Sequence, residues 1–190
     1  MMRASRDQTR PSVARRRRRR RDLARDKRGL AAIEFALIGG TLIFGLFNMI
    51  DFGRYLYAKM EVQNAAQMGV QLVWNTCNTP NLPATTACSN ESTALTTGVQ
   101  STSLGTAVTV VSGYPTEGWY CVNGSGALVS VAAITTSTPA DCTAAGVSTN
   151  QPADYFVVQT TYTYAPLFTA FSVANVLPTP ITSTNYMRMQ

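Results

Sequence analysis

Hydrophobic positions fall into two patterns along the first half of the chain, and the earlier pattern is a continuous apolar run. Residues 30–50 carry one charged side chain, that of Glu34. An α-helix needs about 20 apolar residues to cross the hydrocarbon core of a bilayer, so this run predicts a membrane-spanning helix. A buried helix of a soluble protein is the alternative. The basic residues directly upstream favour the membrane, because cytoplasmic flanks of membrane helices are rich in Lys and Arg.

The second pattern is amphipathic and continues the helix. Residues 51–74 contain no proline, and apolar side chains recur there at helical spacing. These positions are Phe52, Tyr55, Leu56, Val62, Ala65, Ala66, Gly69, Leu72 and Val73. One helix over residues 30–74 would be about 68 Å long, which is longer than a bilayer is thick. We therefore expect its second half to leave the membrane and cover another part of the protein, and Asn78, Pro80 and Pro83 to end it.

Residues 75–190 predict a small β domain. Of these 116 residues, 34 are Ser or Thr and only five are charged. Gly, Pro and Asn turns separate short β-prone runs at residues 106–112, 119–122, 127–134, 155–164 and 181–189. We expect an antiparallel sheet packed on the exposed half of the long helix, and a short amphipathic helix over residues 167–177. The predicted fold class is α+β, with a long N-terminal membrane-spanning helix and a small antiparallel β-sheet domain.

Charge separates the N-terminal arm from the rest of the chain. Thirteen of the 16 Lys and Arg residues precede Gly29, against three acidic residues, whereas the remaining chain has more acids than bases. A run of like charges repels itself, so the arm is predicted to be disordered and solvated. The acidic remainder excludes a basic globular face that would bind nucleic acid. The chain has no His, which excludes His-based catalytic triads and most zinc or haem sites. We therefore predict no enzyme, no cofactor, no metal site and no nucleic-acid partner.

All four cysteines follow the apolar run, at Cys77, Cys88, Cys121 and Cys142. An even number confined to one side of a membrane predicts two disulfides in an exported domain, with three connectivities. We favour Cys77–Cys88 with Cys121–Cys142, because both close short local loops, and each would stabilise the fold by about 3 kcal/mol. A zinc site of four thiolates is the alternative, but no pair has the C-x-x-C spacing.

The junction between the arm and the apolar run carries the order KRGLAAIEF at residues 27–35. Basic residues, a glycine, a short apolar stretch, Glu-Phe and then a hydrophobic helix resemble the type III signal of prepilins. The resemblance implies that a prepilin peptidase cuts after Gly29 on the cytoplasmic face. Leu30 would become the new N-terminus, and the hydrophobic helix would stay in the mature protein. Ordinary signal peptides are instead cut beyond the hydrophobic run.

A longer stretch, from Gly29 to Val73, resembles a TadE-type domain, which is a pseudopilin module of the bacterial Tad (Flp, tight-adherence) pilus and secretion systems. The matching elements are Gly29, Glu34-Phe35-Ala36-Leu37, Asp51-Phe52-Gly53-Arg54, and Asn64-Ala65-Ala66 before Gly69. The chain departs from the family where proline often follows the glutamate, because it has Gly39 and Gly40 there. The resemblance implies a pilin-like structural subunit that serves filament assembly, surface adherence or secretion.

The resemblance also assigns an assembly role to Glu34 and Phe35. A carboxylate inside the bilayer costs about 2.5–3.5 kcal/mol on insertion scales, so it should have a partner. In the family such a glutamate pairs with the free N-terminus of a neighbouring subunit and sets the register. The alternative is a Glu34 side chain that snorkels to the headgroups. Asp51 and Arg54, at i and i+3, are expected to form a solvated helix pair at the outer interface, with a register role as the alternative.

Three parts follow from these patterns: a basic cytoplasmic leader over residues 1–29 that is removed, a membrane-spanning and amphipathic helix over 30–75, and an extracytoplasmic Ser/Thr-rich β domain over 76–190. The expected location is the bacterial inner membrane in a single pass, with the N-terminus cytoplasmic and the C-terminal domain periplasmic or extracellular. A pilus is the further expected location. The expected partners are a prepilin peptidase, other pilins and pseudopilins of the same system, an inner-membrane assembly platform and membrane lipid. The alternatives are a bitopic membrane protein whose outer domain binds a ligand or surface, a membrane-bound protein whose arm binds nucleic acid, and an enzyme of unrecognised type.

Overall fold

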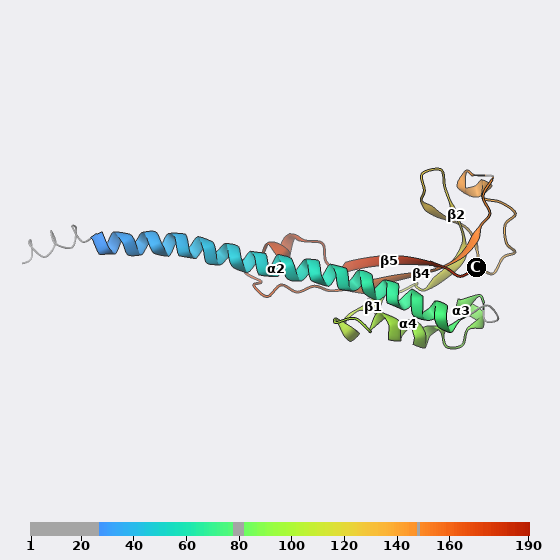
Figure 1. Ribbon diagram of the computed structural model, residues 1–190, viewed down its shortest axis with the longest axis horizontal. Helices are drawn as coiled ribbons and strands as arrows, with labels where there is room; N and C mark the ends of the chain where they lie inside the picture. Colours follow the sequence, from blue (N-terminus) through green and yellow to red (C-terminus); the bar gives the residue numbers. More distant parts are fainter. Residues whose placement is uncertain (1–26, 78–81, 148) are drawn as a thin grey trace, which may run out of the picture. The chain divides into compact units, whose positions relative to one another are not determined.

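The computed structural model describes residues 27–77, 82–147 and 149–190 (Figure 1). The described residues form two compact units that divide between Phe47 and Asn48. The predicted disordered arm lies outside the described residues except for its last positions, as do the predicted helix stops Asn78 and Pro80.

A single helix, α2, runs over Lys27–Thr76 and so extends the predicted helix by a few residues at each end. In the first unit its apolar side chains all point outward, from Leu30 at 60% exposed to Phe47 at 39%. An α-helix satisfies its own backbone hydrogen bonds, so such a segment suits a lipid environment. The helix is long and apolar enough to cross a membrane, which is consistent with a single-pass membrane protein.

In the second unit α2 buries one face. The buried positions follow each other at intervals of three or four residues, which is the helical period, and they cover Asp51, Tyr55, Ala58, Val62, Ala65, Ala66, Gly69, Val70 and Val73. Phe52 and Leu56, which the amphipathic pattern included, stay more than 40% exposed. The second half of the helix therefore covers another part of the protein, as the pattern predicted.

The partner of this face is a five-stranded antiparallel sheet. The strands are β1 (Thr109–Val110), β2 (Thr116–Val122), β3 (Leu128–Ala133), β4 (Ala153–Tyr162) and β5 (Ile181–Arg188). The long strand β4 is central: β5 pairs along one side of it, from Tyr155↔Arg188 to Tyr162↔Ile181. β1 and β2 follow each other along the opposite side, and β3 pairs with β2. The α+β fold class is confirmed.

Alternation along β4 decides which side chains meet the helix. Phe156, Val158 and Thr160, one residue in two, are fully buried on one face of the strand. Val157 between them is also buried, so the other face is covered there as well. The Thr160 hydroxyl donates a hydrogen bond to the carbonyl of Val62 on α2, at 3.1 Å. A polar strand residue can thus lie in this core because a helix carbonyl accepts its proton.

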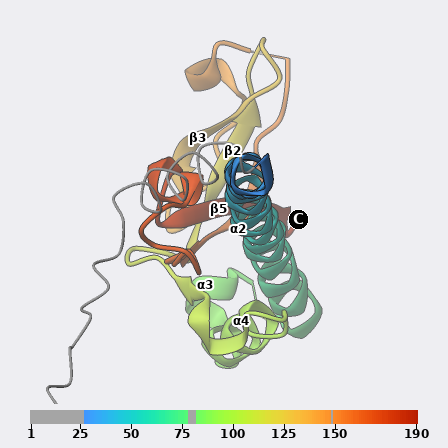
Figure 2. The ribbon, with the colours of Figure 1, turned by 90° about the vertical axis from the view of Figure 1, so that its left-hand side faces the viewer.

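Two helices, α3 (Ala84–Ala87) and α4 (Glu91–Val99), were not predicted from the sequence. The α4 sequence ESTALTTGV is rich in residues of weak helix propensity, so its helix depends on tertiary packing. Figure 2 shows α4 beside α2. A Cβ atom on Gly98 would lie 2.6 Å from the carbonyl oxygen of Met68 and 2.8 Å from the Cα of Gly69. Glycine at these two positions therefore lets the two backbones approach.

The predicted amphipathic helix over residues 167–177 is wrong. Only a 3-10 turn, η4 (Val173–Val176), forms there; the other 3-10 turns are η2 (Gly105–Ala107) and η3 (Thr143–Ala145). The backbone amides of Leu167, Phe168 and Val173 donate to side chains of α2 instead of to carbonyls of a helix of their own. Local helical spacing was present, but these tertiary acceptors determine the conformation.

Candidate functional site

The residues of the predicted cleavage site lie on the first turns of α2. Leu30 is 60% exposed and Phe35 is 79% exposed. A Cβ atom added to Gly29 would meet no other atom within 4 Å among the described residues. Packing in the described part of the chain therefore does not require glycine at position 29. The cleavage after Gly29 stays a prediction.

Glu34 is exposed on the same helix, one turn after Leu30. Its neighbours in sequence are apolar, so its carboxylate would enter a membrane together with an otherwise hydrophobic surface. Within the described part of the chain no side chain or backbone group bonds to it. Both predicted roles of Glu34, pairing with a neighbouring subunit and snorkelling, remain predictions.

Asp51 is the first residue of the buried stripe on α2 and is fully buried. Its Oδ1 accepts a hydrogen bond from the backbone amide of Leu167 at 2.9 Å, and its Oδ2 accepts one from Phe168 at 3.1 Å. The expected solvated pair of Asp51 and Arg54 is therefore wrong for Asp51. The two backbone amides stabilise its charge together with the side chain of Ser172 and the nearby charge of Arg54. Hydrogen bonds to a charged group are among the stronger ones in proteins.

Two tyrosines make further contacts in this part of the molecule. The hydroxyl of Tyr164 donates to the backbone carbonyl of Asp51 at 2.9 Å, and the hydroxyl of Tyr55 donates to that of Pro178 at 3.0 Å. The two rings meet edge to face with centroids 5.4 Å apart. Burial, and then the charge of Asp51, raise the pKa of the Tyr164 phenol, so it stays a neutral donor.

One turn earlier on α2, Asn48 makes a further contact with the same part of the chain. Its Oδ1 accepts a hydrogen bond from the backbone amide of Val173 at 2.7 Å. Asn48, Asp51 and Tyr55 thus hold the chain between β4 and β5 at three points. Sequence reasoning found Asp51 as a helix-pair residue but missed this role, because the donors are backbone amides more than 100 residues away.

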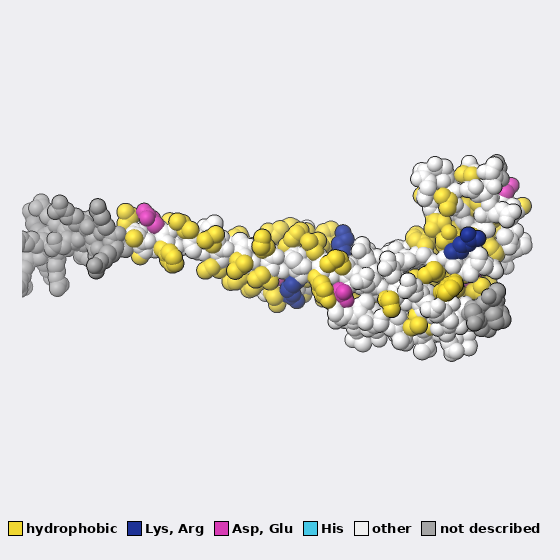
Figure 3. Space-filling model, viewed as in Figure 1, with side chains coloured by type: hydrophobic (Ala, Val, Ile, Leu, Met, Phe, Trp, Pro, Cys, Tyr) yellow, Lys and Arg dark blue, Asp and Glu magenta, His cyan; other side chains and the backbone are white. Residues whose placement is uncertain are grey.

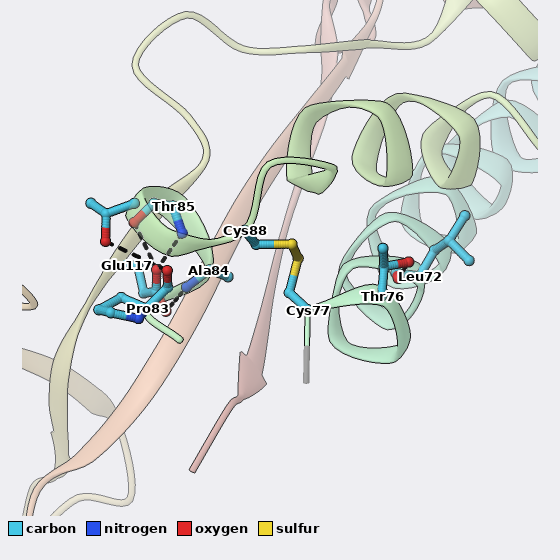
Figure 4. The surroundings of a disulfide bond; sticks show 9 residues. Leu72, Thr76, Cys77, Pro83, Ala84, Thr85, Cys88 and Glu117 are labelled. Carbon is cyan, nitrogen blue, oxygen red and sulfur yellow. Dashed lines mark hydrogen bonds between the residues drawn. A yellow bond between two sulfur atoms is a disulfide. The ribbon is translucent and has the colours of Figure 1, made fainter. Parts of the chain in front are cut away.

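The first disulfide joins Cys77, directly after α2, to Cys88, directly after α3 (Figure 4). Close to it, Glu117 of β2 accepts hydrogen bonds from the backbone amides of Ala84 and Thr85, at 2.9 and 2.7 Å. A carboxylate at the start of a helix satisfies amides that have no partner within the helix. The disulfide thus connects the C-terminal end of α2 to α3, and Glu117 connects α3 to the sheet.

The second disulfide joins Cys121 of β2 to Cys142, at the start of η3. It attaches the long connection between β3 and β4 to the sheet. The structure thus contains the pairing Cys77–Cys88 and Cys121–Cys142 that we favoured because it closes short loops. Among the described residues there is no free cysteine.

A group of carboxylates that the sequence did not single out lies around Glu117. Asp154 of β4 is fully buried, and neither of its carboxylate oxygens accepts a hydrogen bond. Burial, and then the charge of nearby Glu117, raise the pKa of Asp154 to about 7. The same two causes raise the pKa of Glu91. Among the described residues these groups do not form a metal site.

Comparison with known proteins agrees with the resemblance seen in the sequence. Residues 29–71 match the model of the family of TadE-like proteins. No curated protein and no solved structure shows significant similarity to the chain. The matched residues lie on α2 and include Glu34, Asp51 and most of the buried stripe. The comparison confirms the resemblance: residues 29–71 are a TadE-like segment, and this family suggests a protein associated with a Tad pilus.

Proposed function

We propose that this protein is a minor pseudopilin of a Tad-type pilus machine. One observation carries the proposal. The helix that matches the family from residue 29 also exposes an apolar surface, and Glu34 lies in that surface. TadE-like proteins are structural, and the role proposed here is structural as well: the helix packs with other pilins, and the folded unit at residues 48–190 is carried outside the membrane.

In this proposal a prepilin peptidase removes residues 1–29 on the cytoplasmic face, and α2 then anchors the mature chain in the inner membrane. The basic residues of the leader hold the N-terminus inside before cleavage, in accordance with the positive-inside rule. The two disulfides support an oxidising location for residues 77–142, since disulfides persist mainly outside the cytoplasm.

In this proposal the exposed apolar side chains of the first unit mediate filament assembly. In the membrane they face lipid, and in a filament they face the same helix of other subunits. Glu34 then pairs with the α-ammonium group of Leu30 in a neighbouring subunit, since a buried carboxylate is costly without a partner. The assembly platform of the inner membrane is the remaining expected partner.

The test is a deletion of the gene in the host, with piliation scored by electron microscopy and the protein traced by immunoblotting. Loss of pili on deletion, with the protein recovered in membranes and in sheared filaments, would support the proposal. Normal pili in the deletion strain would favour the alternative, a bitopic protein whose outer domain binds a ligand or a surface.

A further inference from the structure

The segment 166–178, between β4 and β5, exposes an unusual number of large apolar side chains. Leu167 is 59% exposed, Phe171 70%, Val173 53% and Val176 81%. The chain carries no charged residue between Asp154 and Arg188. Figure 3 shows hydrophobic side chains gathered in the part of the molecule where this segment lies beside α2. A contiguous exposed apolar patch indicates a contact with a partner or a membrane.

Hydrogen bonds fix the level of this segment along α2. Asn48 and Asp51 accept from the amides of Val173, Leu167 and Phe168, and Tyr55 donates to the carbonyl of Pro178. Asn48 and Asp51 are also the residues at which the apolar run of 30–50 ends. The exposed patch is therefore attached to the turn of α2 at which a membrane-spanning helix would leave the hydrocarbon core.

The next turns of α2 have the composition of a membrane interface. Phe52 and Tyr57 are 45% and 49% exposed, and Arg54 and Lys59 are exposed cations on the turns of α2 after the apolar run. Aromatic rings and basic side chains gather at the headgroup level of membrane proteins. The segment 166–178 thus continues a membrane-facing surface, and its lack of charge matches the same environment.

We propose that the segment 166–178 inserts its apolar side chains into the outer interface of the bilayer that α2 crosses. It forms a second lipid contact, which holds the folded unit of residues 48–190 at the membrane surface. Amphiphilic elements bind there through buried apolar area. This inference rests on the membrane crossing of α2 that belongs to the proposed function.

The experiment places the photoreactive amino acid p-benzoylphenylalanine at position 171 or 176 of the full chain. Ile43, in the apolar run and 53% exposed, is the control for membrane crossing, and Val122, at the end of β2 and 42% exposed, is the control for a surface outside the membrane. Each protein is inserted into vesicles of phosphatidylethanolamine and phosphatidylglycerol and irradiated. Mass spectrometry then detects adducts, and non-reducing gels check that both disulfides are intact.

We expect lipid adducts at positions 43, 171 and 176. At position 122 the yield of lipid adducts should not exceed the background. Lipid adducts at 43 without any at 171 and 176 would overturn the inference and leave the membrane crossing standing. Adducts at 171 and 176 to a second protein chain in place of lipid would also overturn it. An absence of adducts at 43 would contradict the membrane crossing itself, and the inference with it.

Discussion

The carboxylate of Asp51 accepts a hydrogen bond from the backbone amide of Leu167, 2.9 Å away and 116 residues further along the chain. This contact joins the residue that follows the apolar run to the connection between the two longest strands of the sheet. A charge at this place would be costly if it were buried alone. The amides of Leu167 and Phe168 compensate for that cost, so Asp51 connects the helix to the domain.

Replacing Asp51 therefore tests how the helix and the domain are held together. Asp51→Ala leaves the amides of Leu167 and Phe168 without an acceptor and opens a small cavity. We expect a loss of several kcal/mol in unfolding free energy, since hydrogen bonds to charged groups contribute about 1.5–3 kcal/mol each. Denaturant unfolding of the protein in detergent, followed by circular dichroism, measures this loss. The matched control is Arg54→Ala, because Arg54 is exposed on the same helix. Equal effects of the two substitutions would restore the interpretation of a solvated pair.

The buried carboxyl of Asp154 predicts a dependence of stability on pH. The folded pKa of Asp154, about 7, is above the unfolded value near 3.8, so the folded state holds the proton more tightly. The contribution to stability is complete below about pH 4 and is lost as the pH rises toward 7. We expect a higher melting temperature at pH 5 than at pH 8, and a smaller difference in Asp154→Asn, which carries no charge at either pH.

Asp141→Asn is the control for this effect. Asp141 is exposed, and hydrogen bonds from Thr143 lower the pKa of its carboxyl, so it is ionised at both pH 5 and pH 8. The control should keep the difference between pH 5 and pH 8. An unchanged difference in Asp154→Asn would assign the pH dependence to another group.

The crossing of α2 and α4 predicts a steric effect at Gly98. Gly98→Ala places a methyl group 2.6 Å from the carbonyl oxygen of Met68, so the helices must separate. We expect a loss of about 1–3 kcal/mol in unfolding free energy, as for other overpacked sites. Gly53→Ala on the exposed face of α2 meets nothing within 4 Å, and it should be neutral or stabilising, because alanine favours helix. A stable Gly98→Ala variant would mean that this helix contact is loose.

The proposed register role predicts a specific phenotype for Glu34. Glu34→Ala and the isosteric Glu34→Gln should both be cleaved after Gly29, because the cut lies about one helical turn before residue 34. Both should impair filament formation. Electron microscopy of the complemented deletion strain and immunoblots of the processed protein measure the two effects separately. Ile33→Leu, which exchanges one exposed apolar side chain for another next to Glu34, is the control. Normal piliation with Glu34→Gln would favour the snorkelling alternative.

Periodicity was sufficient to predict α2, most of its buried stripe and the strand β4, because side-chain spacing along one element reflects one partner surface. It wrongly included Phe52 and Leu56 in the stripe. It was not sufficient for Asp51, because the carboxylate oxygens of this residue accept hydrogen bonds from backbone amides, and no side-chain pattern reveals such donors. The helix α4 was not predicted because its residues have weak helix propensity. Its packing on α2 at Gly69 and Gly98 stabilises it instead. The carboxyl of Asp154 had no signal at all, since its environment arises only when β2 and β4 pair.

The most direct test of the account is the N-terminal sequence of the protein recovered from membranes of strains with and without the host's prepilin peptidase. The account predicts a start at Leu30 that depends on the peptidase, which would identify residues 1–29 as a removed leader. An intact basic arm in both strains would contradict the pseudopilin proposal, and so would a cut beyond residue 50.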